Sequence, residues 1–285
     1  MQITRALSEH PELFLQEGAR RNLLWFAEYM DPNFEPTPFH VAYYRVLDMF
    51  VKRKIRKLII QAPPQHGKSQ GSSRFLPADM LGHFPDLKFC ICSYAATIAK
   101  DFNRDVQRLI DSDKYRAIFP DTQLNGSNVV TVANNYLRNS DVFEIVGHTG
   151  SLRVVGRGGS LTSKTVDVMI YDDLYKDSAE ANSPIIRTAA WEWFTKVAQT
   201  RLHNDSQQLV VFTRWNPDDI IGKIIESEKV VFAERWSDFD NIPSGAWVLV
   251  NFEAIKTGNA TEIDAREPGQ PLWPKRHSLE RLLQQ

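Results

Sequence analysis

The apolar and polar positions of the chain alternate between short continuous apolar runs and longer segments of helical period. The apolar runs predict strands over residues 58–60, 87–94, 166–170, 208–212 and 247–252. Apolar positions at three- and four-residue spacing predict helices over residues 9–29, 39–53, 95–110 and 183–202, and from Ile220 onward. A chain of 285 residues with this pattern fits one large α/β domain with appendages, built on a mainly parallel sheet flanked by helices.

Two regions depart from this alternation. Short β-type stretches separated by Asn and Gly turns occupy residues 129–159, which predicts antiparallel hairpins laid against the parallel core. Three prolines within residues 31–38 indicate an arm that wraps or links. We therefore expect an N-terminal helix and arm at 1–38, the main domain at 39–255 and a connector at 256–285. The aromatic face of the helix over 183–202 favours core packing over a base-stacking platform; its members are Trp191, Phe194, Val197 and Ala198.

The first strand runs into a turn broken by Pro and Gly that ends in Gly67-Lys68-Ser69 and opens a helix. A strand, such a loop and a helix form a phosphate-binding site, because the loop N–H groups and the helix N-terminus point at the anion. Lys68 is expected to reach the β- and γ-phosphates and Ser69 to hold Mg2+. The residues that we expect to bind the nucleotide are Pro64, Gln65, His66, Gly67, Lys68, Ser69 and Gln70. Ala62 stands where the usual motif has its first glycine, and the alternative is a Gly-Lys-Ser that only caps a helix.

A second strand, over 166–170, ends in two acids about a hundred residues later. Asp172 is expected to hold the Mg2+ shell, and Asp173 to orient and polarise the attacking water. Alone, a strand that ends in Asp-Asp is usually a turn, but the preceding Gly67-Lys68-Ser69 makes that coincidence less frequent. Thr213 follows a third strand, and a polar group there can sense the γ-phosphate.

His40 opens the helix before the first strand. Its ring could face the edge of an adenine, or it could be a helix cap or a surface residue, and the residues leave both open.

Composition limits the remaining functions. The formal charge of −1, from 34 basic and 35 acidic residues, is no signature of a nucleic-acid binder, so a DNA contact must be local, formed by a ring of copies or made by a part that is missing. An isolated monomer should bind DNA weakly and in a salt-sensitive way. A basic run, Lys52-Arg53-Lys54, precedes the first strand. No apolar run is long enough to span a bilayer, and we expect an intracellular protein.

The two cysteines, Cys90 and Cys92, alternate along a predicted strand and share one face. No further Cys or clustered His completes a metal site around them. We interpret them as small buried hydrophobic residues rather than as a redox or zinc site.

Together these residues make the chain similar to the ATPase domain of phage and prophage terminase large subunits. The matching blocks, in order, are residues 36–40, 62–69, 93–96, 156–162, 169–173, 200–202, 212–219 and 271–274. The resemblance implies a P-loop fold of the ASCE type, named for an additional strand and a catalytic acid. It also implies an ATPase motor that uses ATP and Mg2+ to translocate double-stranded DNA into a procapsid. The implied partners are the portal protein, the small terminase subunit and further copies in a ring, within the host cytoplasm.

By the same resemblance, Lys68 and Ser69 are the phosphate and Mg2+ groups, Asp172 the Mg2+-shell acid, Asp173 the catalytic acid, and Thr213-Arg214-Trp215 the coupling motif. Asp173 is one methylene shorter than the glutamate usual in such enzymes. Our candidates for the trans-acting arginine finger are Arg157 and Arg153, with Lys164 behind them, because Thr162-Ser163-Lys164 replaces the Thr-Gly-Arg of many relatives.

Family members continue into a nuclease domain, so we expect an excised motor domain or a split subunit without nuclease activity. The alternatives are a helicase-like remodelling ATPase, for which we find no specific motif, and a scaffold module that holds nucleotide without turnover. Loss of hydrolysis with retained nucleotide binding in Asp173→Ala would exclude the scaffold module.

Overall fold

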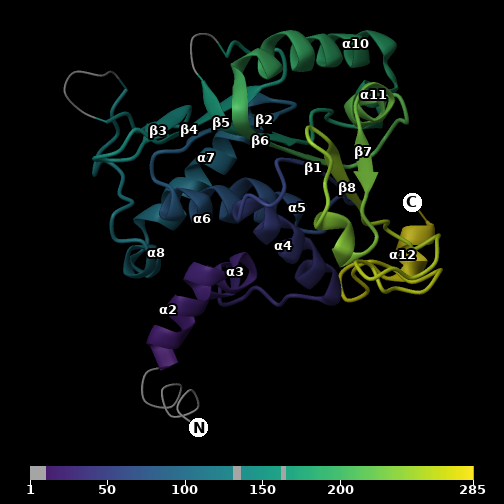
Figure 1. Cartoon of the computed structure of the whole chain (residues 1–285), viewed down its shortest axis with the longest axis horizontal. Helices are drawn as coiled ribbons and strands as arrows, with labels where there is room; N and C mark the ends of the chain where they lie inside the picture. Colours follow the sequence, from purple (N-terminus) through teal and green to yellow (C-terminus); the bar gives the residue numbers. More distant parts are fainter. Residues whose placement is uncertain (1–10, 131–135, 162–164, 285) are drawn as a thin grey trace.

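A computed structural model describes residues 11–130, 136–161 and 165–284 of the chain. Its centre is an eight-stranded sheet in the order β3-β4-β2-β5-β6-β1-β8-β7 (Figure 1). Neighbouring strands are parallel except for β3 and β4, which are antiparallel. The strands are β1 Lys57–Gln61, β2 Lys88–Ser93, β3 Val142–Glu144, β4 Ser151–Gly156, β5 Val166–Asp172, β6 Leu202–Phe212, β7 Val230–Phe232 and β8 Trp247–Asn251.

The strand order confirms the ASCE type of P-loop fold. β6 lies between β1, which leads into the phosphate loop, and β5, which ends at the two acids. Val211 of β6 pairs with Ile60 on one side and with Asp172 on the other. Because these strands are parallel and in this register, their carboxyl ends meet at one edge of the sheet, where ligands bind in open α/β folds.

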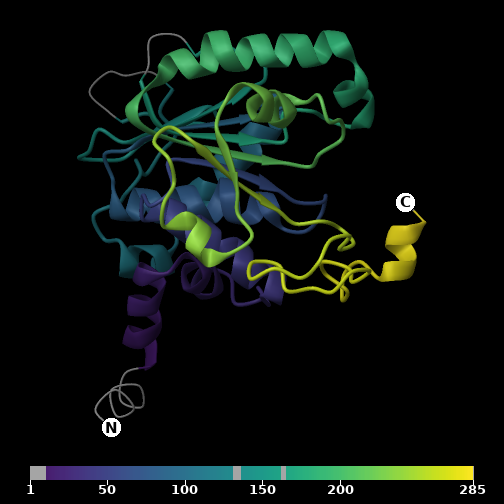
Figure 2. The same cartoon turned by 45° about the vertical axis from the view of Figure 1, so that its right-hand side comes forward.

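Helices cover both faces of the sheet (Figures 1 and 2). α3, α4, α6 and α7 lie on one face, and α10 and α11 on the other. The α-helices are α2 Pro11–Arg21, α3 Leu23–Met30, α4 Pro38–Val51, α5 Lys68–Gln70, α6 Leu76–His83, α7 Ala96–Asp111, α8 Asp113–Ile118, α9 Ser178–Asn182, α10 Pro184–Trp193, α11 Ile220–Ser227 and α12 Leu279–Leu283. The π-helical turns are η1 Gly71–Phe75 and η2 Phe194–Ala198, and the 3₁₀ turns are η3 Gln199–Arg201 and η4 Trp236–Phe239.

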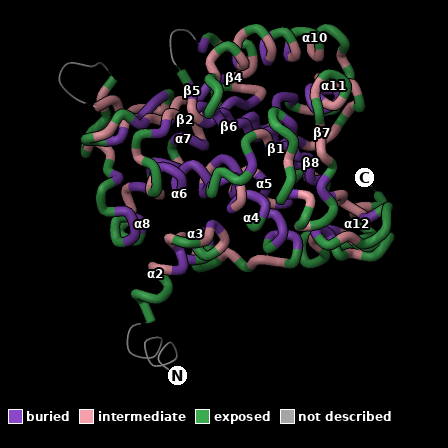
Figure 3. Tube along the Cα trace, in the orientation of Figure 1, coloured by how far each residue is buried: buried purple, intermediate pink, exposed green. Residues whose placement is uncertain are grey.

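Two hydrophobic cores result, one on each face, and the buried positions follow the sheet through the molecule (Figure 3). Successive residues of β1 point to opposite faces, so Leu58 and Ile60 join the core under α4, whereas Ile59 joins the core under α10 and α11. Burial on both faces explains why β1 reads as a continuous apolar run.

The structure corrects the helix predicted over 9–29. In the described part of that range the chain forms two helices, α2 and α3, because Asn22 leaves helical geometry at φ −149° and caps α3, where its side chain accepts hydrogen bonds from Leu24 N and Trp25 N. α2 projects from the body of the molecule (Figures 1 and 2).

The region predicted as hairpins also differs. β3 and β4 are antiparallel, as expected, but β4 also pairs in parallel with β2 and so extends the central sheet. The predicted stretch at Val129 forms an isolated antiparallel bridge with Arg138, and residues 131 and 132 lie outside the described residues.

Two smaller predictions are confirmed. Phe194 and Ala198 are buried in the core under α10, and Trp191 and Val197 pack against it. Cys90 and Cys92 are free thiols fully buried in the same core, and burial raises the pKa of Cys92. No helix among the described residues is long and apolar enough to cross a membrane.

Candidate nucleotide site

The phosphate loop connects β1 to α5 through two residues of left-handed backbone conformation. Gln65 has φ 60° and Gly67 has φ 79°. Glycine adopts this conformation without strain, and here it also keeps the loop close to α4, since a Cβ on Gly67 would lie 3.4 Å from His40 Nε2. The loop N–H groups and the start of α5 thus face the carboxyl edge of the sheet.

Lys68 points back across this edge to the end of β5. Its Nζ lies 2.7 Å from Asp173 Oδ2 and donates a hydrogen bond of 3.0 Å to Thr213 Oγ1. Thr213 N in turn donates to Asp173 Oδ1 at 2.9 Å. The structure therefore brings together three of the residues predicted to be catalytic, from the loop, from β5 and from β6.

Asp173 occupies a left-handed position, with φ 41°, directly after β5. Its backbone bridges two neighbouring strand ends, because its N–H donates to Val211 O and its carbonyl accepts from Tyr94 N. Asp tolerates this conformation better than most residues, and the turn aims the carboxylate at Lys68.

Asp172 and Ser69, the predicted Mg2+ residues, are also in contact. Ser69 Oγ donates to Asp172 Oδ1 at 3.0 Å, and Ser73 Oγ donates to Asp172 Oδ2. Asp172 is buried, and burial together with the charge of Asp173 raises its pKa to about 6, while Lys68 and the two serine hydroxyls oppose that shift.

Sequence reasoning missed three side chains that support the loop. Ser73 binds Asp172, whereas Tyr43 Oη and Ser72 Oγ both donate to the carbonyl of Lys68, at 2.6 and 2.9 Å. The spacing contained a signal for Ser73, since residues four apart share a helix face and Ser69 was already assigned. Nothing in the sequence indicated Tyr43, which comes from α4.

His40 lies under the loop rather than open to a ligand. The ring is 1% exposed, its Nδ1 accepts from Thr37 N at 3.2 Å, and its Nε2 lies beside Gly67. Burial lowers the pKa of His40 to about 4, against a backbone hydrogen bond with His66, so the ring is neutral at pH 7. Of the two alternatives, the structure places His40 as a helix cap, and its contact with an adenine stays a prediction.

The C-terminal segment packs on the loop from the same side. His277 stacks on His66 with ring centroids 4.4 Å apart, and its Nε2 lies 3.3 Å from Gln65 O. His66 Nδ1 donates to Pro64 O at 2.7 Å, and burial lowers the pKa of His66 to about 4. Trp273 meets the ring of His40 edge-on at 4.6 Å. A segment more than 200 residues away in the chain thus supports the predicted phosphate-binding residues.

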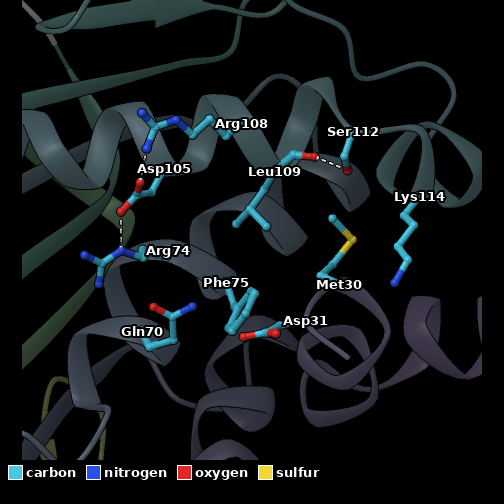
Figure 4. A pocket seen from close by; sticks show the side chains of 10 residues that line it. All are labelled: Met30, Asp31, Gln70, Arg74, Phe75, Asp105, Arg108, Leu109, Ser112 and Lys114. Atoms are coloured by element: carbon cyan, nitrogen blue, oxygen red, sulfur yellow. Dashed lines mark hydrogen bonds and ion pairs between the residues drawn. The ribbon is translucent and has the colours of Figure 1, made fainter. Parts of the chain in front are cut away.

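Two cavities border the loop. One, of about 520 Å3, lies at the carboxyl edge and is lined by residues 61–64, 213–217 and 251–254. Its size is within the range of small-molecule sites. The other, of about 500 Å3, lies between α3, η1 and α7, and Gln70 lines it beside Arg74, whose Nε is 2.6 Å from Asp105 Oδ2 (Figure 4). The side chain of Gln70 therefore faces away from Asp172 and Asp173.

The predicted arginine fingers lie apart from this group. Arg157 is held within the chain, since its Nη1 donates to Leu174 O at 2.6 Å and lies 2.9 Å from Glu180 Oε2. Arg153 sits within β4, opposite Cys90 and three residues before the strand's carboxyl end. Lys164 lies outside the described residues. The identity of the finger stays a prediction.

Comparison with solved structures gave three large terminases among the similar folds. The ATPase domain of the Thermus phage P74-26 large terminase is 13% identical over 85% of this chain and 85% of that chain, with TM-score 0.49. The HK97 bacteriophage large terminase is 12% identical over 89% of this chain and 48% of that chain, with TM-score 0.48. The large terminase of a thermophilic bacteriophage in complex with ATP-γ-S is 12% identical over 74% and 44%, with TM-score 0.39. This chain thus spans about half the length of the two whole terminases.

Comparison with curated proteins gave no match. Comparison with protein families matched residues 59–282 to the family described as terminase large subunit, T4-like virus type, N-terminal. The TM-scores lie below 0.5, so the assignment rests on this family match, which spans most of the chain from the first strand to α12. The chain belongs to the family of terminase large subunits of the T4-like virus type, whose N-terminal part it matches.

Proposed function

We propose that this chain is an ATPase that hydrolyses ATP with Mg2+, and that hydrolysis drives double-stranded DNA into a procapsid. One observation carries the proposal: Lys68 and Ser69 of the loop meet Asp173 and Asp172 at the end of β5, with Thr213 beside them. Family membership supports the same function. We assign the ATPase domain to residues 39–255.

The site fits a Mg2+ ion. Neighbouring ligands of an octahedral Mg2+ lie about 2.9 Å apart, given metal–oxygen distances of about 2.0–2.1 Å. Ser69 Oγ and Asp172 Oδ1 are 3.0 Å apart, so both can face one ion, and the remaining positions suit phosphate oxygens and water. Bound there, Mg2+ would neutralise charge on the β- and γ-phosphates.

Lys68 and Asp173 have linked roles. The loop N–H groups and the ammonium of Lys68 bind the phosphates, so the ammonium must leave Asp173 Oδ2 when ATP arrives. The released carboxylate orients the attacking water and accepts a hydrogen bond from it. The water oxygen bonds to the γ-phosphorus as the bond to the ADP oxygen breaks. Thr213, which touches both Lys68 and Asp173, reports this change to β6.

We further propose that the chain acts in the host cytoplasm as a ring on the portal protein, fed by the small terminase subunit. An arginine from a neighbouring copy would then complete each site, as arginine fingers do in related NTPases. Arg157 is a candidate only if the assembly releases it from Glu180.

The experiment is ATP turnover by the purified chain, with and without double-stranded DNA, beside Lys68→Ala and Asp173→Ala. We expect both variants to lose turnover, Asp173→Ala to keep nucleotide binding, and DNA to stimulate the wild type. Turnover that survives Asp173→Ala would contradict the assignment of the acid. Nucleotide binding without turnover, even with procapsids present, would favour the scaffold module.

A further inference from the structure

The basic run after α4 forms one side of a cavity at the amino edge of the sheet. This cavity of about 700 Å3 is lined by Arg53, Lys54, Arg56 and Lys57, by the start of β6 and by the loop over residues 242–246. The nucleotide site lies at the opposite edge, because β1 begins at Lys57 and ends just before the phosphate loop. The cavity is therefore separate from the site described above.

The cationic side chains of this cavity differ in how firmly they are held. Lys57 Nζ lies 2.7 Å from Glu228 Oε2, which also accepts from Trp247 Nε1, so Lys57 is part of the fold. Arg56 pairs with Asp205 at 3.1 Å, but the two side chains are 60% and 71% exposed, and such pairs contribute little. The side chain of Lys54 is exposed and has no hydrogen bond or ion pair to the described residues.

The other lining groups favour an anion. No carboxylate lines the cavity in the described part of the chain, although the protein has slightly more acidic than basic residues. The polar lining consists of amides, hydroxyls and one imidazole: Gln199, Gln208, Asn204, Ser206, Ser244 and His203. By contrast, the cavity at the carboxyl edge includes Glu253.

A purely structural explanation covers only part of the run. Cations near the end of a helix offset its dipole, and Lys52 also pairs with Asp48 one turn earlier. Lys54 and Arg56 lie beyond the last turn of α4, which ends at Val51, so the dipole does not account for them. Their exposure leaves both free to meet a partner.

We propose that this basic cavity binds the phosphate backbone of double-stranded DNA, with Lys54 and Arg56 as the main contacts. The choice of DNA as the anion rests on the proposed function. Guanidinium and ammonium groups surrounded by neutral donors bind phosphates without reading bases, which suits a protein that must move along any sequence. A phosphate would take Arg56 from Asp205 at little cost, since that pair is exposed. The contact also meets the requirement that a nearly neutral chain bind DNA through a local surface.

The test is fluorescence anisotropy of a labelled duplex at several salt concentrations, starting near about 50 mM, where backbone contacts are strongest. We expect Lys54→Ala/Arg56→Ala to weaken binding about tenfold or more at low salt and to reduce the slope of log K against log salt by about two. Arg21→Ala/Lys196→Ala is the matched control, because it also removes two exposed cations. Lys54→Arg/Arg56→Lys should keep the slope of the wild type.

Four results would overturn the proposal: no binding by the wild type at low salt, no effect of the double variant, an equal loss in the control, or competition by polyglutamate as strong as that by unlabelled duplex. The last would indicate an acidic protein as the partner. ATP turnover without DNA should be unchanged in Lys54→Ala/Arg56→Ala. Absence of turnover in every protein, with the DNA result as expected, would remove the motor function and leave the DNA surface.

Discussion

Lys68 Nζ and Asp173 Oδ2 are 2.7 Å apart, so the phosphate-binding lysine and the proposed catalytic acid neutralise each other in this structure. Thr213 holds both, since its hydroxyl accepts from Lys68 and its N–H donates to Asp173. Lys68 is 6% exposed, and a buried ammonium without an anion is costly. Asp173 therefore occupies the place that a phosphate takes when ATP binds.

This competition predicts opposite effects of Asp173→Asn on binding and on chemistry. Removal of the carboxylate charge frees Lys68 for the phosphates, so we expect several-fold tighter ATP binding. Turnover should fall about 10²- to 10⁴-fold, because the group that orients and polarises the attacking water is lost. Fluorescent-nucleotide titration and phosphate release measure the two effects. Asp177→Asn is the control, because Asp177 only caps α9 and Asn caps equally well. Weaker ATP binding in Asp173→Asn would contradict the competition.

Ser73→Ala should disturb the Mg2+ residues more than Ser72→Ala does. Both hydroxyls are fully buried, but Ser73 donates to a carboxylate of the site and Ser72 to a helix carbonyl. Loss of the Ser73 hydroxyl leaves Asp172 Oδ2 without that donor, at a cost of about 1–3 kcal/mol. We expect a lower urea midpoint and a higher Mg2+ concentration for half-maximal turnover. Equal Mg2+ dependence in the two variants would show that Ser73 does not position Asp172.

His40 should make the protein less stable in mild acid. Its pKa is about 4 in the folded state, below the ordinary value of 6.5, so only the unfolded chain takes up the proton as the pH falls below 6.5. The stability present above pH 6.5 is thus lost progressively toward pH 4, by about 1–2 kcal/mol between pH 7 and pH 5.

His40→Gln tests this, because glutamine does not titrate. Urea unfolding of the variant should depend less on pH than that of the wild type. His66 shifts stability in the same direction, and Asp172, with its raised pKa, in the opposite one. Both remain in the variant, so the difference between the two proteins isolates His40. An identical pH dependence would be inconsistent with a neutral, buried ring.

His277→Ala should weaken nucleotide binding although His277 lies outside the phosphate loop. The substitution removes the stacking on His66 and the contact with Gln65 O, and an aromatic pair of this kind contributes about 0.5–1.5 kcal/mol. We therefore expect the Kd for ATP to rise about two- to tenfold by fluorescent-nucleotide titration. His83→Ala is the control, since His83 packs edge-on against Phe119 away from the loop. An unchanged Kd in His277→Ala would mean that the C-terminal segment does not support the loop.

The sequence alone determined the parts of this protein that depend on neighbouring residues. The apolar runs predicted the strands β1, β2, β5 and β8 and the carboxyl end of β6, because burial on both faces requires continuous apolar residues. Gly67-Lys68-Ser69 and Asp172-Asp173 predicted the nucleotide site, since each follows directly on such a strand.

Only the tertiary structure decided which distant groups meet. Tyr43 reaches Lys68, Ser73 reaches Asp172 and His277 covers His66 because parallel pairing and helix packing bring their elements to one edge. The same packing buried His40 beneath Gly67, and left Lys54 and Arg56 exposed at the far edge. Local propensity carries no information on such contacts, because they form between residues from tens to more than 200 positions apart, and their energy arises only when the sheet assembles.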